Sequence, residues 1–143
     1  MRLHLAGHYW SYSEPRRITW DGEAIDGICV QGPRREIRVV RRLPIAKKAE
    51  IQLHELCHAS NFSASEQWVT TWSSGTTALM HLAGVGLARV RTAPDGKETI
   101  RKVLFHALRI GRHDLDDDRH LQAIADDLTR ALLRLGWRQL TPK

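Results

Sequence analysis

The sequence predicts an α+β domain, with a small antiparallel or mixed sheet in its N-terminal part and a helical half after it. Two observations lead to this prediction. Strand-like segments and turn signals fill most of residues 2–41, whereas helical periodicity dominates after Pro44. Since 143 residues is the usual size of one domain, we expect a single domain over residues 1–143.

The expected strands follow one another along the first third of the chain. Residues 2–12 alternate in part between apolar and polar side chains, and residues 17–20 form a second, shorter strand. Asp21 and Gly22 then give a hairpin turn signal. Residues 23–30 are a third strand or a short irregular segment, and residues 34–41 are the most convincing strand of all.

Four helices are expected in the rest of the chain. The first covers residues 46–59, which contain no Gly or Pro, and the second runs from about Ser65 to Met80 or beyond. A third helix covers residues 99–110, where apolar residues recur at helical spacing. The last begins in an acidic cluster and ends at Gly136.

The first expected helix contains the pattern His-Glu-x-x-His, formed by His54, Glu55 and His58. Histidines four residues apart lie on the same face of a helix, so their imidazoles can converge on one metal ion. Glu55 projects from nearly the same face and can take a proton from an attacking water. The spacing therefore predicts a zinc (Zn2+) site with Glu55 as the catalytic base.

The motif and its surroundings resemble the zincin metallopeptidases, and among them the small gluzincin type of bacteria and phages. In that family a strand precedes the signature helix, and a second helix supplies a glutamate ligand. Residues 35–40 look like this strand and residues 63–69 like the start of the second helix. The resemblance implies that Glu66 is the third ligand and that residues 35–40 line the cleft as an edge for an extended substrate. It covers roughly residues 35 to 80, and only His-Glu-x-x-His is specific within it.

The residues themselves leave alternatives open for the rest of the site. Ser63 and Glu66 also have the spacing of a capping box, in which Glu66 would bind the backbone N–H of Ser63. The acidic cluster offers Asp114, Asp116 and Asp117 as other ligands, although carboxylates at a helix start have an ordinary explanation. The candidates for a group that stabilises the oxyanion are His4, His8, Tyr9, Tyr12, His81 and His106.

These observations predict a zinc metallopeptidase, a hydrolase that cleaves peptide bonds in a peptide or protein substrate. The alternative is a non-catalytic basic binding or regulatory protein on a zincin-like fold, with a nucleic acid or a protein as partner. The net charge of +6 permits a nucleic-acid partner, but the basic residues come as scattered pairs, which an ordinary solvated surface also explains. The sequence leaves the oligomeric state open.

The expected location is the cytoplasm. Cys29 and Cys57 are too few for a disulfide scaffold, and the first eight residues lack the apolar run of a signal peptide. The longest weakly apolar run, residues 78–88, contains His81 and two glycines, so no membrane span is expected.

Overall fold

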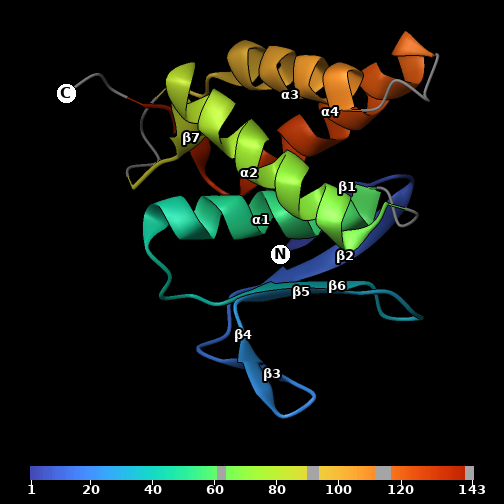
Figure 1. The fold of residues 1–143 in the computed structure, drawn as a ribbon, viewed down its shortest axis with the longest axis vertical. Helices are drawn as coiled ribbons and strands as arrows, with labels where there is room; N and C mark the ends of the chain where they lie inside the picture. The colour runs from blue at the N-terminus through green and yellow to red at the C-terminus, as the bar shows by residue number, and fades with distance from the viewer. Residues whose placement is uncertain (61–63, 90–93, 112–116, 141–143) are drawn as a thin grey trace.

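The computed structural model describes residues 1–60, 64–89, 94–111 and 117–140, and it has the predicted α+β class with a mixed sheet. Helix α1 (Ile45–Ser60) lies across one face of the sheet, and α2 (Glu66–Leu82) lies on the other side of α1 (Figure 1). Helices α3 (Lys97–Gly111) and α4 (Asp118–Arg134) pack against each other at the end farthest from the β3–β4 hairpin.

Four strands form the main sheet: β1 (Arg2–Leu5), β2 (His8–Ser13), β5 (Gly27–Val30) and β6 (Glu36–Val39). Their order is β1-β2-β6-β5, with a parallel pair between β2 and β6 and antiparallel pairs elsewhere. Alternate side chains of these strands enter the core beneath the helices. The buried ones are Leu3, Leu5, Trp10, Tyr12, Ile37 and Val39.

The expectation of one strand over residues 2–12 is wrong, because the chain reverses at Ala6 and Gly7. Both residues have positive φ values, +52° and +78°, as a tight two-residue hairpin turn requires. Apolar and polar residues alternate in both strands of the hairpin, because directly paired residues such as Leu3 and Trp10 lie on the same face of the sheet. Periodicity therefore does not distinguish this hairpin from one long strand.

A second hairpin leaves the sheet and forms a separate pair. Strands β3 (Ile18–Trp20) and β4 (Glu23–Ile25) flank the predicted turn at Asp21 and Gly22, which is confirmed. The single strand or irregular segment expected over residues 23–30 is instead split between β4 and β5. Backbone hydrogen bonds hold the chain on both sides of this hairpin. Arg41 N–H donates to Pro15 O (2.9 Å), and Val40 N–H donates to Asp26 O (2.8 Å).

Strand β6 lies in the interior of the sheet, between β2 and β5. The edge role implied for residues 35–40 is therefore wrong. β5 occupies that edge, and it also contacts α1 directly. A periodicity that reveals a strand does not reveal which neighbours it acquires.

The helix positions agree closely with the prediction, whereas the last strand pair was not expected. β7 (Val85–Leu87) and β8 (Trp137–Gln139) are three residues long and follow glycines that end α2 and α4. Strands this short carry too little periodicity to be recognised. None of the helices in the described ranges is long and apolar enough to cross a membrane.

Candidate metal centre

Helix α1 places His54 and His58 side by side in its last two turns. Their Nε2 atoms lie 3.2 Å apart, and the two ring centroids are separated by 4.8 Å. The opposite face of the same helix is buried through Leu53, Leu56 and Cys57. Packing of this apolar face fixes the rotation of α1, so the pair of imidazoles is directed away from the core.

Glu66 approaches both histidines from the start of α2. Its Oε1 lies 2.8 Å from His54 Nε2, and its Oε2 lies 2.8 Å from His58 Nε2. The N-cap of α2 is Ser65, whose hydroxyl accepts from the backbone N–H of Trp68 (3.1 Å). Glu66 is therefore the first helical residue rather than the third, so it does not occupy the capping-box position.

The donor set fits a zinc ion with an open coordination position. Candidate ligand atoms from His54, His58 and Glu66 all lie within 4.8 Å of one another. Two imidazoles and one carboxylate are a ligand set that catalytic zinc uses. The side chain of Glu66 is 71% exposed, so the cluster opens to solvent on this side, where water or a substrate has access.

The protonation state of His54 also suits a metal ligand. Burial lowers the pKa of His54, while the nearby Glu66 carboxylate partly opposes this shift. A lowered pKa keeps the imidazole neutral at pH 7, and a neutral imidazole has the lone pair that a metal ion needs.

Glu55 is the second carboxylate near the cluster, and it is only 6% exposed. Its Oε1 lies 3.8 Å from His54 Nε2. Burial, and secondarily the charge of Glu66, raises the pKa of Glu55 to about 8. A divalent cation beside it would favour the ionised form, because an opposite charge stabilises a carboxylate.

Two residues of β5 that the sequence did not single out pack beneath this part of α1. A Cβ added at Gly27 would lie 2.5 Å from Ile51 Cγ2 and 3.2 Å from Glu55 Cγ, so a larger side chain would require these two side chains to shift. Burial, and secondarily Glu55, raises the pKa of Cys29 to about 12. A glycine within a strand pattern signals close backbone approach, and Gly27 could have been identified in this way.

The other ligand candidates lie elsewhere or outside the described residues. Asp117 is the N-cap of α4 and accepts from the N–H of Arg119 (2.9 Å), as its position at a helix start suggests. Asp114 and Asp116 fall outside the described residues. In the part of the chain that the structure describes, the only group of at least three candidate ligands is His54, His58 and Glu66.

The oxyanion candidates are spread over the molecule. His4 stacks edge-on against Tyr9, with ring centroids 5.0 Å apart. Tyr12 is buried and donates to Glu14 Oε2 (2.8 Å). His81 lines a cavity at the other end of α2. None of these side chains belongs to the group formed by His54, His58 and Glu66.

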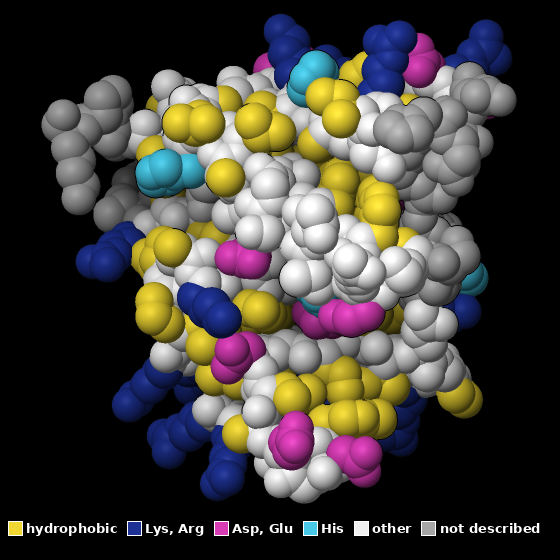
Figure 2. All heavy atoms as spheres, in the orientation of Figure 1, with side chains coloured by type: hydrophobic (Ala, Val, Ile, Leu, Met, Phe, Trp, Pro, Cys, Tyr) yellow, Lys and Arg dark blue, Asp and Glu magenta, His cyan; other side chains and the backbone are white. Residues whose placement is uncertain are grey.

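Basic side chains gather around the loop between β6 and α1. Residues 1–48 carry ten Lys or Arg and five Asp or Glu, so five of the six net positive charges belong to this third of the chain. The backbone bond from Arg41 to Pro15 joins two basic segments. Several Lys and Arg side chains project from the lower left of the molecule in Figure 2. The exposed members are Arg16, Arg17, Arg41, Arg42 and Lys47.

A scan against protein-family models and searches of the curated proteins and of the solved structures found no match to this chain.

Proposed function

We propose that the protein is a zinc-dependent metallopeptidase. The observation that supports this most is the convergence of His54, His58 and Glu66, with the buried carboxylate of Glu55 beside them. His54, His58 and Glu66 would hold the metal. Zinc bound at such a site polarises the scissile carbonyl and lowers the pKa of water.

Glu55 would act as the general base. Its position next to His54 and away from bulk solvent suits a group that takes a proton from the attacking water and passes it to the leaving amine. Burial raises the pKa of Glu55 and so stabilises its protonated form. This suits a group that holds the proton of the water until the leaving amine takes it.

Strand β5 would orient the substrate. Among the described strands, β5 is an edge strand of the main sheet, so one of its edges has no strand partner in that sheet. The same strand contacts α1. An extended peptide can add to such an edge through backbone hydrogen bonds. This mode of binding places a peptide bond along α1, where Glu55 lies.

The decisive experiment combines metal analysis with a matched pair of variants. Protein purified without added metal should contain or take up one zinc per chain, measured by elemental analysis and zinc titration. Glu55→Gln should keep zinc and lose about 10³-fold in hydrolysis of a peptide library, because the amide cannot accept the proton. Glu50→Gln, one turn earlier on α1, is the control and should keep its activity.

Three results would separate the possibilities. Hydrolysis that survives Glu55→Gln contradicts the proposed base. Zinc uptake without hydrolysis of any peptide favours a regulatory protein with the same ligands. A protein that takes up no zinc is not a zinc peptidase.

The concentration of cations around the β6–α1 loop favours a second candidate, binding of a nucleic acid through this basic surface. Affinity for a DNA or RNA oligonucleotide should then fall steeply with salt. Arg41→Gln with Arg42→Gln should weaken binding and reduce the salt dependence, while Arg130→Gln with Arg134→Gln on α4 serves as the control. Equal effects of both pairs would indicate general attraction to a basic protein.

A further inference from the structure

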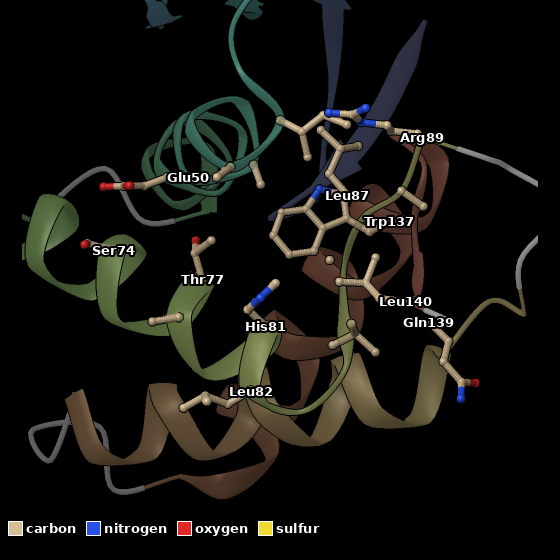
Figure 3. Close-up of a pocket in the computed structure, with 17 residues that line it drawn as sticks. Glu50, Ser74, Thr77, His81, Leu82, Leu87, Arg89, Trp137, Gln139 and Leu140 are labelled. Carbon is tan, nitrogen blue, oxygen red and sulfur yellow. The ribbon is translucent and has the colours of Figure 1, made fainter. Parts of the chain in front are cut away.

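A large cavity lies between the first half of α1, the second half of α2 and the β7–β8 pair (Figure 3). Its volume is about 830 Å³, which is within the usual range of small-molecule sites. Small residues create much of this space, since larger side chains at these positions would occupy it. They are Ala46, Ala49, Ala78, Gly86 and Ala88.

Two polar groups that already have partners line the cavity. The indole of Trp137 forms one wall, and its Nε1 donates to Gln52 Oε1 (2.8 Å). The hydroxyl of Thr77 donates to Ser73 O (2.7 Å). These groups therefore do not require a polar ligand, and the space beside them suits an apolar group.

The charged groups at the cavity favour an anion at its rim. The guanidinium of Arg89 extends across the rim, and the imidazole of His81 points inward (Figure 3). Arg89 forms no ion pair with any residue of the described ranges. Among the described residues that line the cavity, Glu50 is the one acidic residue, and its carboxylate points away from the centre.

We propose that this cavity binds a small apolar carboxylic acid, with the apolar chain in the cavity and the carboxylate on Arg89. An arginine guanidinium forms two parallel hydrogen bonds with a carboxylate, which fixes the orientation of the ligand. The site shares no residue with the metal centre: the described lining of the cavity contains none of His54, His58 and Glu66. The proposal therefore does not depend on the peptidase function.

The test uses three ligands with the same ten-carbon chain: decanoate, decanol and decylamine. Calorimetric titration below their micelle concentrations should give the tightest binding for decanoate and the weakest for decylamine. Arg89→Gln should weaken decanoate about tenfold and leave decanol unchanged, because only the charge-assisted contact is removed. Arg89 is exposed, so this substitution should leave the fold intact, which circular dichroism can verify.

A second variant assigns the binding to this cavity. Thr77→Phe should fill part of the space and weaken both decanoate and decanol, whereas Thr71→Phe, on an exposed position of the same helix, should not. The titrations should agree between metal-free and zinc-loaded protein.

Four outcomes would overturn the proposal: no heat with any of the three ligands, decylamine binding as tightly as decanoate, Thr77→Phe without effect, or decanoate binding only when zinc is present. The last outcome would mean that the carboxylate binds the metal.

Discussion

Helix α1 has two polar faces that differ in how completely their groups are paired. On one face Gln52 donates to the hydroxyl of Tyr12 (3.0 Å) and accepts from Trp137 Nε1 (2.8 Å). The chain of bonds continues from Tyr12 to Glu14, which pairs with Lys48 (2.6 Å). On the other face His54, His58 and Glu66 meet at the surface, next to buried Glu55.

The two faces differ in their net charge and in whether their carboxylates are paired with a basic side chain. In the Gln52 network, the one carboxylate faces an ammonium group, and each buried polar group has a partner. On the histidine face, two carboxylates lie near two imidazoles, and no lysine or arginine of the described residues pairs with either carboxylate. The first arrangement is complete as a structural unit. The second has the composition that binds a cation, and the predictions below test this contrast.

The largest effect is expected for His54→Ala, which removes one of the two imidazoles. Zinc at about a thousand times its dissociation constant should stabilise the parent protein by about 4 kcal/mol, and this stabilisation should vanish in the variant. Thermal unfolding with and without zinc measures the difference. His81→Ala on α2 is the control and should retain the full response; a full zinc response in His54→Ala would exclude this histidine as a ligand.

Gln52→Leu tests the other face of the helix. Leucine preserves approximate shape but leaves the Trp137 N–H without its acceptor, so the free energy of unfolding should fall by about 3 kcal/mol. Urea unfolding of the metal-free protein measures this loss, and zinc stoichiometry should remain unchanged. The exposed Gln67→Leu should stay within about 0.5 kcal/mol of the parent. If both variants behave alike, the network contributes little to stability.

Glu66→Gln separates a ligand from a surface carboxylate. Loss of the negative charge should weaken zinc binding at least about tenfold, whereas Asp117→Asn should leave the affinity unchanged, since Asn also serves as an N-cap. Competition with a chelating dye gives both affinities. Equal zinc affinity in parent and Glu66→Gln would mean that the third ligand comes from another residue.

The smallest effect is expected for Ser65→Ala, which removes the cap that fixes the start of α2. The free energy of unfolding should fall by about 1 kcal/mol, because the N–H of Trp68 loses its acceptor. Chemical denaturation measures this change. Zinc binding should persist, since Glu66 itself is intact; its complete loss would mean that the metal centre depends on the cap more than its geometry suggests.

Local signals predicted most of what lies within one segment. The helices, the turn at Asp21 and Gly22 and the histidine pair follow from spacing and turn chemistry over a few residues. Glu66 was placed near the histidines because it begins the next helix, and the contacts with His54 and His58 agree with that placement.

The parts that were missed depend on contacts between distant segments. The edge position of β5, the close approach of Gly27 to Glu55 and the bond between Gln52 and Trp137 join residues 28 to 85 positions apart. A central strand and an edge strand have the same alternation when one face is buried. Nothing in the residues next to Gln52 distinguishes a buried glutamine from an exposed one, so its bonds to Tyr12 and Trp137 cannot be predicted from the local sequence.

The β3–β4 hairpin has a consequence for engineering the protein. Its two ends are bound by Arg41 and Val40, which are adjacent in the sequence, so the chain leaves and returns at nearly the same place. Segments with closely spaced ends at the surface tolerate insertion and replacement, because the rest of the backbone keeps its path. The exposed turn at Asp21 and Gly22 is therefore a suitable position for inserting an affinity tag or a fluorescent peptide that leaves α1 and its histidines in place.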